Sequence, residues 1–280
     1  MGYLGISGWI LILSNILFSY QGLKDESFLN RYAFDVDKIL ISKEYKRLIS
    51  SGFLHVSWTH LLFNMLSLYF FYGGLELSLG EGKAVLIYMV SLVGGDLLTL
   101  FIHKNHGDYS SVGASGAISG VIFASIALFP GMGISFFGLP FSIPAWAYGL
   151  GYVLYSIYGI KSKRDNTGHE AHLGGGITGL LIAIALVPQV IRVNYIPILL
   201  ILIPTFVFLI LIIRNPHYLM VGTLFQKPKK TYFNIDEKYN AEKREQELEL
   251  DEILDKIHRK GINSLSKQEK EKLDRYSNKR

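Results

Sequence analysis

A serine at the start of one hydrophobic run and a histidine at the start of another are the residues best suited to joint chemistry. Ser115 lies in the run GASGAISG, residues 113–120, and His172 follows a short polar stretch. Serine is a weak nucleophile until a neighbouring base takes its proton. A serine–histidine pair would supply both the nucleophile and the base of an acyl-transfer reaction, provided that the two side chains meet.

Small residues follow both side chains at i, i+4 spacing. Gly116 and Gly120 follow Ser115, and Gly175 and Gly179 follow the histidine. Faces of this kind let two membrane helices approach closely. We therefore expect the two helices to pair and to bring the serine Oγ within hydrogen-bonding reach of the histidine. The alternative is a glycine and serine surface that serves packing alone.

The depth of Ser115 in a membrane also indicates a function. The run from Ser115 to Phe129 has about 15 residues, or roughly 22 Å of helix, whereas a bilayer core is about 30 Å thick. The first residue of such a helix would lie inside the membrane, next to unpaired N–H groups that favour negative charge. A polar residue held at that depth is a candidate functional residue.

His60 and Asn64 are candidate donors to a developing oxyanion. They lie four residues apart on one predicted helix and therefore share a face. Together with the backbone N–H of Ser115 they could form an oxyanion hole. The alternative is that each side chain bonds a neighbouring helix.

A metal site is the competing interpretation of the histidines. His169, Glu170 and His172 have the spacing H-E-x-H, which lacks the i, i+4 histidines of the zinc motif H-E-x-x-H. We therefore predict no metal and no cofactor, and we expect His103 and His106 to be solvated in a loop.

Composition predicts an all-α polytopic membrane protein. Half of the 280 residues are apolar, mean hydropathy is positive, and several apolar runs are long enough to span a bilayer. Cysteine is absent, which excludes disulfides and cysteine nucleophiles. The net charge of +5 is concentrated near the end of the chain, where 15 of the 28 Lys and Arg residues lie beyond residue 226. Because acidic residues alternate with them, we do not expect nucleic-acid binding.

The apolar runs predict six membrane helices, then a seventh and a soluble tail. The six are expected at about 3–20, 57–72, 84–102, 115–129, 144–160 and 171–187. We assign residues 1–190 to a catalytic membrane domain, 191–214 to an additional transmembrane helix, and 215–280 to a soluble, charged tail with helical character. The second helix is expected to end at Gly73-Gly74, with Glu76 in a polar turn after it. Residues 21–56 are too many for an unstructured loop and are expected to be ordered.

Four stretches of the sequence carry a family resemblance. They are Arg47 with Gly52-Phe53-Leu54-His55, His60-Leu-Leu-Phe-Asn64, Gly113-Ala-Ser115-Gly116, and Ala171-His172-Leu-Gly174-Gly175. In their order and their helix numbers these stretches resemble the rhomboid intramembrane serine proteases over roughly residues 1–190. The resemblance implies a compact six-helix bundle with a water-filled cavity that opens to the outer face.

The resemblance also implies roles for single residues. Ser115 would be the nucleophile and His172 the general base, while His60, Asn64 and the Ser115 amide would form the oxyanion hole. The residues expected to support this site are Arg47, His55, Glu76, Gly113, Gly116 and Gly175. The implied substrates are single-span membrane proteins, cut within or just outside the bilayer of the cell (inner) membrane. The fifth helix and the loop before His172 are the candidate gate and cap.

The sequence departs from the family pattern at three places. Ser119 stands where many members have a Tyr or Phe whose ring packs on the catalytic histidine, so another group, such as Phe123, must orient His172. Asp96 is less usual and either contacts the dyad or bonds a neighbouring helix. Lys46-Arg47 replaces the frequent Trp-Arg pair, which weakens an interfacial anchor.

Two functions are therefore in competition. The first is an active intramembrane protease, and the alternative is a catalytically inactive relative that binds membrane proteins without cutting them. Loss of the serine or the histidine would indicate the second function, and both residues are present. A transporter is disfavoured, because the predicted helices lack the paired broken segments of inverted repeats.

Overall fold

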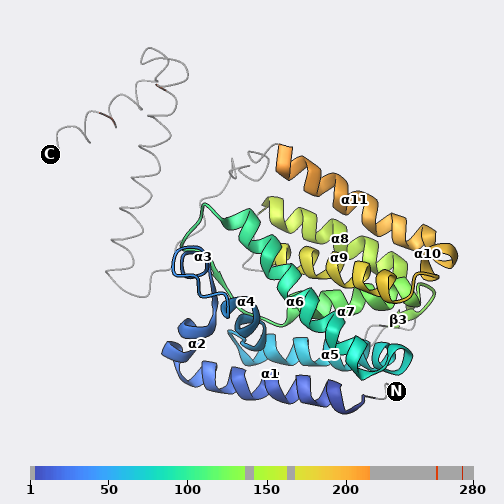
Figure 1. Cartoon of the computed structure of the whole chain (residues 1–280), viewed down its shortest axis with the longest axis horizontal. Helices are drawn as coiled ribbons and strands as arrows, with labels where there is room; N and C mark the ends of the chain where they lie inside the picture. Colours follow the sequence, from blue (N-terminus) through green and yellow to red (C-terminus); the bar gives the residue numbers. More distant parts are fainter. Residues whose placement is uncertain (1–3, 136–141, 163–167, 215–256, 258–272, 274–280) are drawn as a thin grey trace. The chain divides into compact units, whose positions relative to one another are not determined.

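A computed structural model describes residues 4–135, 142–162 and 168–214, together with Ile257 and Leu273. Within these ranges the chain is almost entirely helical (Figure 1). The helices are α1 (Ile6–Lys24), α2 (Glu26–Tyr32), α3 (Val36–Leu40), α4 (Arg47–Ser50), a 3-10 turn η1 (Ser51–Phe53), α5 (Trp58–Leu79), α6 (Glu81–His103), α7 (Ser115–Leu128), α8 (Ala145–Ser162), α9 (His169–Leu186), α10 (Val190–Val193) and α11 (Tyr195–Arg214). Two antiparallel pairs join β1 (Phe34–Asp35) to β2 (Ser110–Ser111) and β3 (Gly133–Ser135) to β4 (Ser142–Pro144).

The serine helix α7 lies at the centre of the bundle. Its residues from Gly116 to Ala127 are all buried, and α5, α6, α8, α9 and α11 contact it. In Figure 1, α1 and α5 lie on one side of the bundle and α8 and α11 on the opposite side. A helix that is apolar on every face has to be surrounded by other helices. The 14 residues of α7 give about 21 Å of helix, which is shorter than a bilayer core.

Glycines set the distance between α7 and α9. A Cβ on Gly175 would overlap the carbonyl oxygen of Gly116, and a Cβ on Gly179 would overlap that of Gly120. The main chains of the two helices are therefore in direct contact, as the small-residue spacing predicts. Because the glycines of each helix follow directly after a candidate catalytic residue, this main-chain contact fixes the separation of Ser115 and His172.

The connection predicted at residues 21–56 begins only at residue 25, because α1 continues to Lys24. From residue 25 to residue 56 it is ordered into short helices, and Arg47 holds them together. Its side chain is buried. Nη1 donates to the carbonyl oxygens of Asn30 (2.9 Å) and Ala33 (2.7 Å), and Nε donates to Glu44 (2.8 Å). The planar guanidinium can satisfy several acceptors at once because its donors point in fixed directions. Arg47 thus joins the end of α2 to the start of α4.

This ordered segment also holds the chain that leads into α7. Phe34 of β1 pairs with Ser111 of β2, and the N–H of Gly113 donates to the carbonyl of Ser51 at 3.1 Å. Both contacts lie within a few residues of Ser115. The long connection before α5 therefore supports the approach to the serine helix.

The predicted end of the second helix is wrong. α5 continues through Gly73-Gly74 to Leu79 and ends at Gly80, whose φ of +84° favours glycine. Glu76 therefore lies within the helix and is buried, rather than in a polar turn. Its carboxylate accepts hydrogen bonds from the N–H of Gly5 (2.5 Å) and from the hydroxyl of Ser7 (2.6 Å). A negative charge at the N-terminus of α1 satisfies unpaired N–H groups and stabilises the helix.

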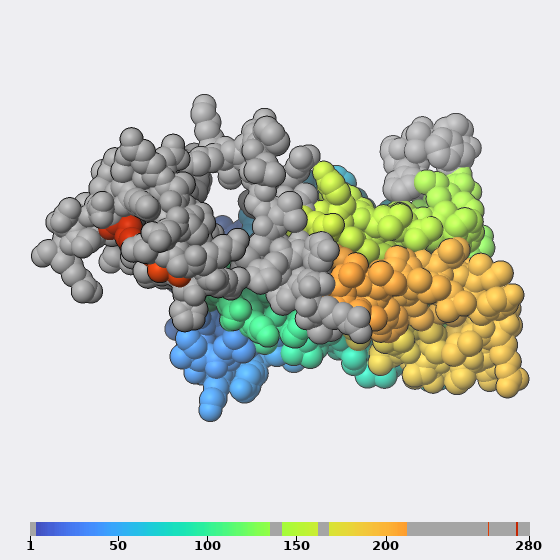
Figure 2. Space-filling model, turned by 90° about the horizontal axis from the view of Figure 1, so that it is seen from above, coloured from blue at the N-terminus to red at the C-terminus, as the bar shows by residue number. Residues whose placement is uncertain are grey.

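The predicted seventh helix forms as α11, with Pro204 inside it, and packs on α8. Figure 2 shows α11 in orange beside the lime-green α8 on this face. By length and composition, α1, α6 and α9 are the described helices able to cross a membrane, and α7 and α11 contain shorter apolar stretches. Except for Ile257 and Leu273, the predicted tail lies outside the described residues.

Candidate active site

Ser115 is the first residue of α7, and the turn before it requires glycine. Gly113 has a φ of +144°, which L side chains rarely adopt. A Cβ there would also lie 3.0 Å from Cε1 of His60. The main chain therefore passes between His60 and Ser115 without a side chain of its own. Ser115 is partly buried, and as the first residue of a helix its N–H has no partner within α7.

The structure brings Ser115 and His172 together. Nε2 of His172 and Oγ of Ser115 are 2.8 Å apart, which is hydrogen-bonding distance. α9 begins at His169, slightly earlier than predicted, so His172 lies in its first turn. With Nε2 as acceptor, the serine hydroxyl donates to the imidazole, and this is the arrangement in which histidine can remove the serine proton.

Tyr152 of α8 is one of the rings beside His172. The two ring centroids are 5.9 Å apart, with planes inclined at 33°. The Tyr152 hydroxyl is 2.8 Å from Oγ of Ser119. Phe123, which the sequence suggested as the neighbour of the histidine, packs edge-on against Tyr152 at 5.7 Å. Sequence reasoning missed Tyr152, because no local motif indicates that a residue of α8 faces the dyad.

His60 and Asn64 face the same space from α5. Both line the cavity that contains Ser115 and His172. In this structure the Asn64 amide donates to the carbonyl oxygen of His60 within its own helix, at 3.0 Å. The His60 ring lies against Gly113, with Nε2 3.2 Å from the position of a Cβ there. The predicted oxyanion donors are therefore near the serine, with the Asn64 amide bonded inside α5.

His55 packs its ring against that of His60. The two rings meet edge to face, with centroids 4.9 Å apart, and Nδ1 of His55 is 2.8 Å from the hydroxyl of Ser19 in α1. Burial, with a smaller effect of His60, lowers the pKa of His55 to about 3. A neutral imidazole at this position links α1 to the start of α5.

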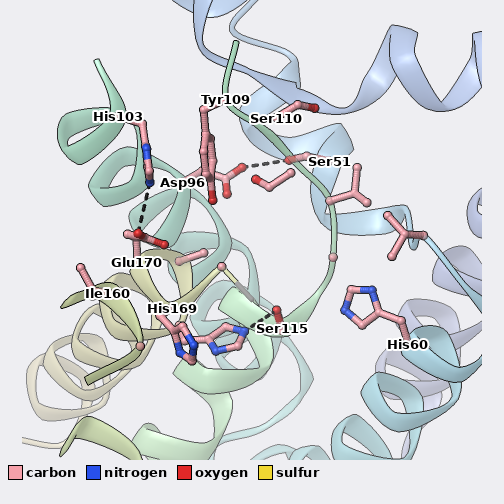
Figure 3. Close-up of a pocket in the computed structure, with 18 of the residues that line it drawn as sticks. Ser51, His60, Asp96, His103, Tyr109, Ser110, Ser115, Ile160, His169 and Glu170 are labelled. Atoms are coloured by element: carbon pink, nitrogen blue, oxygen red, sulfur yellow. Dashed lines mark hydrogen bonds and ion pairs between the residues drawn. The ribbon is translucent and has the colours of Figure 1, made fainter. Parts of the chain in front are cut away.

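A polar arm extends the cavity away from the dyad (Figure 3). The whole cavity has a volume of about 1240 Å³. Asp96 accepts a hydrogen bond from Ser51 at 2.9 Å, so it bonds η1 rather than the dyad. His103, predicted to be solvated, is buried, with Nε2 3.1 Å from Glu170. Its ring stacks on Tyr109 at 3.7 Å.

The polar arm contains acidic and histidine side chains without a metal-binding arrangement. Among the residues that the structure describes, no group of three or more His, Asp or Glu side chains could hold a metal ion. His169, beside the dyad, instead packs its ring edge-on against His172 (5.9 Å) and Tyr155 (5.0 Å). The site therefore brings together a serine hydroxyl, an imidazole and hydrogen-bond donors.

Known proteins with similar sequences match the part of the chain that carries this site. Residues 42–189 match the Rhomboid domain, and residues 233–279 match a family of unknown function. The chain is 29% identical over 222 residues to rhomboid protease AarA of Providencia stuartii, covering 69% of this chain and 77% of that protein. It is 33% identical over 161 residues to the mitochondrial Rhomboid protein 1 of Saccharomyces cerevisiae, covering 55% of this chain and 45% of that protein.

A plant relative extends the comparison. The chain is 31% identical over 194 residues to RHOMBOID-like protein 4 of Arabidopsis thaliana, covering 64% of this chain and 44% of that protein. The chain thus spans about half the length of several curated relatives that it matches. The Rhomboid domain match covers just over half of the 280 residues and contains every residue of the site described above except Ser19. The chain therefore belongs to the rhomboid family and is an all-α polytopic membrane protein.

Proposed function

We propose that the protein is an intramembrane serine endopeptidase that cleaves transmembrane segments of membrane proteins with a dyad of Ser115 and His172. The observation that carries the proposal is the 2.8 Å contact between the serine Oγ and the histidine Nε2, on the wall of a cavity of about 1240 Å³. The similarity to rhomboid protease AarA supports the same reaction. Residues 1–190 would form the catalytic domain.

The geometry supports a two-step acyl transfer. His172 Nε2 takes the hydroxyl proton as Oγ of Ser115 attacks the scissile carbonyl carbon. The resulting oxyanion is stabilised by the Ser115 N–H, with His60 and Asn64 as further donors once the Asn64 amide turns from its bond inside α5. The histidine then gives its proton to the leaving amine and the peptide bond breaks. In the second step, a water molecule gives a proton to His172 and attacks the acyl carbon. The ester bond to Ser115 Oγ then breaks, and His172 returns the proton to Oγ as the product with the new carboxyl end leaves.

The substrate of such a site has to expose a peptide bond inside the membrane. A transmembrane helix hides its peptide groups in internal hydrogen bonds. Residues with poor helix propensity, such as Gly and Pro, lower the cost of unwinding the segment to be cut. We therefore propose single-span membrane proteins with helix-weakening residues near the cleavage point as substrates. The proposed location is the cell (inner) membrane, which membrane fractionation tests.

The test is cleavage of a panel of single-span substrates by the wild type and by Ser115→Ala and His172→Ala. Both variants should lose cleavage, and Ser115→Ala should also lose labelling by a fluorophosphonate probe. Ser125→Ala is the matched control, because Ser125 is a buried serine of α7 that bonds a carbonyl of its own helix. It should cleave like the wild type.

Equal cleavage by the wild type and both dyad variants would overturn the proposal. A chain that captures membrane proteins without Ser115-dependent cleavage or labelling would instead be the inactive, binding relative.

A further inference from the structure

The chain carries an aromatic side chain, Tyr152 of α8, that lies beside His172 and bonds the first turns of the helix that begins with Ser115. Ser119 lies one turn after Ser115 in α7, and its hydroxyl donates to the Ser115 carbonyl oxygen at 2.7 Å. A hydroxyl has one proton to donate. The 2.8 Å contact between Ser119 Oγ and the Tyr152 hydroxyl is therefore donated by tyrosine. A continuous chain of hydrogen bonds runs from α8 to the first turn of the serine helix.

The same tyrosine ring lies beside the proposed base. Its centroid is 5.9 Å from that of His172, which belongs to α9. Tyr152 thus contacts α7 through its hydroxyl and α9 through its ring. Few side chains can join two helices in this way, because the ring must be both large and polar at its tip.

Neighbouring rings fix the position of Tyr152. Phe123 of α7 packs edge-on against it at 5.7 Å, and Tyr148, one turn earlier in α8, is 6.0 Å away. Phe123 is itself held against α9, since a Cβ on Gly176 would lie 3.2 Å from the Phe123 ring. The tyrosine therefore has support on several sides, and its ring presents a defined surface to the histidine.

A base in acyl transfer needs a fixed ring position through both steps. Misplacement of reacting groups by about 1 Å can lower a rate about 100-fold. An aromatic ring within about 6 Å also favours a positive charge on its neighbour, and His172 becomes positive after it accepts the serine proton. The Tyr152 ring meets both requirements by its position.

We propose that Tyr152 is a positioning residue that orients His172, and that the Ser119 hydroxyl anchors it. This proposal rests on the proposed protease function. Because Tyr152 belongs to α8, the base is oriented when α8 is docked on α7 and α9. Displacement of α8 would remove the ring and would lower the rate of the chemical step, although the serine–histidine pair belongs to two other helices.

The experiment measures kcat, KM, the rate of fluorophosphonate labelling and the unfolding temperature of full-length variants. Tyr152→Leu removes the ring, Tyr152→Phe keeps it without the hydroxyl, and Ser119→Ala removes the anchor. We expect kcat to fall about 30-fold for Tyr152→Leu and about threefold for Tyr152→Phe and Ser119→Ala, with KM unchanged within about twofold. Labelling of Ser115 should slow in parallel with kcat.

Two controls separate positioning from folding. Tyr158→Leu changes a tyrosine of α8 that is 54% exposed, and it should leave kcat and labelling unchanged. The double variant Ser119→Tyr with Tyr152→Ala moves the aromatic ring from α8 to α7. This double variant should have at least a third of the wild-type kcat, because its tyrosine ring again lies beside His172.

The outcomes distinguish failure of this inference from failure of the proposed function. A Tyr152→Leu variant with wild-type kcat, or one whose loss of kcat equals its loss of folded protein, would overturn the positioning role while cleavage by the wild type stands. Failure of the ring transfer to recover any kcat would also overturn it. A wild type without Ser115-dependent cleavage or labelling would overturn both proposals.

Discussion

The two helices that bring side chains to Ser115 meet α7 in different ways. α9 contacts α7 main chain to main chain, because Gly175 and Gly179 place no side chain between them. α8 contacts α7 through side chains, above all the hydrogen bond between Tyr152 and Ser119. The distance between Ser115 and His172 is thus set by main-chain packing, while the surroundings of His172 depend on side chains.

The two kinds of contact differ in how they fail. Between two close-packed main chains there is no void that could hold an extra atom. An added methyl group therefore has to push the two helices apart. A side-chain hydrogen bond contributes about 1 kcal/mol net and can be exchanged for another partner. We therefore expect the α7–α9 contact to tolerate no change, and the α8 contact to be the one that can open and close.

The largest expected effect comes from adding one methyl group between α7 and α9. Gly175→Ala places a Cβ on the Gly116 carbonyl oxygen and should destabilise the fold by about 2–3 kcal/mol. Because the overlap also separates the dyad, Ser115 labelling by a fluorophosphonate should fall below a tenth of the wild type. The measurements are the unfolding temperature in detergent and the labelling rate.

Gly74→Ala is the control for this substitution. Gly74 lies inside α5, and apart from its own stretch of helix no atom lies within 4 Å of the position that a Cβ would take. Alanine there should be neutral or slightly stabilising, since it has the higher helix propensity. Equal effects of the two substitutions would show that the α7–α9 contact is not as close as described.

A smaller effect is expected where α1 meets α5 through the Glu76 carboxylate. Glu76→Gln keeps the shape but removes the charge at the α1 N-terminus, so stability should fall by about 1–2 kcal/mol. Glu81→Gln, at an exposed position in the first turn of α6, should change stability by less than about 0.5 kcal/mol. The stability changes of both variants are measured from their unfolding temperatures. A Glu81→Gln effect as large as that of Glu76→Gln would refute the role of the Glu76 carboxylate in capping the N-terminus of α1.

His55 predicts a pH dependence of stability. Its pKa is lowered from 6.5 to about 3 by burial and, less, by His60. Below pH 6.5 the unfolded chain therefore binds a proton that the folded chain does not. Stability should fall as the pH falls from about 6.5 towards 3, by up to about 1.4 kcal/mol per pH unit. Unfolding temperatures measured across this range should drop less steeply in His55→Gln.

Exposed His106 provides the comparison for this slope. His106→Gln should stay closer to the wild-type pH dependence than His55→Gln, because the His106 side chain is exposed in the folded chain, whereas that of His55 is buried. If His55→Gln and the wild type had parallel profiles, the buried neutral imidazole would not be the cause.

Sequence could predict the contact between Ser115 and His172 because its signals are local. Ser115 and His172 each begin a hydrophobic run, and the glycines behind them have a spacing that indicates helix contact. Tyr152 could not be found in this way. Which side chain of α8 faces the histidine depends on the rotation of that helix, and rotation is decided by packing over several turns. The one available signal was Ser119, whose small side chain leaves room beside the base.

The end of α5 was mispredicted for a related reason. Gly73-Gly74 lowers intrinsic helix propensity, and the local pattern therefore indicates a stop. Glu76 reverses that preference in the folded protein, because its carboxylate bonds Gly5 and Ser7 at the start of α1. A contact across some 70 residues of sequence has no signature within a short window.

The smallest expected effect tests whether α11 belongs to the part that can move. A Cβ on Gly149 of α8 would lie 3.0 Å from Cδ1 and 3.6 Å from Cγ1 of Ile201 in α11. The same Cβ would lie 2.7 Å from Cδ1 of Ile126 in α7, a side-chain end that has to turn aside. Cysteines at positions 149 and 201 would face each other across the contact of α8 with α11, and the sequence has no cysteine to interfere. Gly149→Cys with Ile201→Cys should cross-link on oxidation, and the cleavage rate should change by less than about twofold.

The reason is that α11 contacts α8, while the dyad distance is set between α7 and α9. If α8 moves relative to α7, locking it to α11 leaves that movement free as long as the two helices travel together. Loss of cleavage on oxidation, recovered with a reductant, would show that α8 has to separate from α11 during turnover. In that case α11 would restrain α8 rather than move with it. The reduced double variant is the control for the effect of the two substitutions themselves.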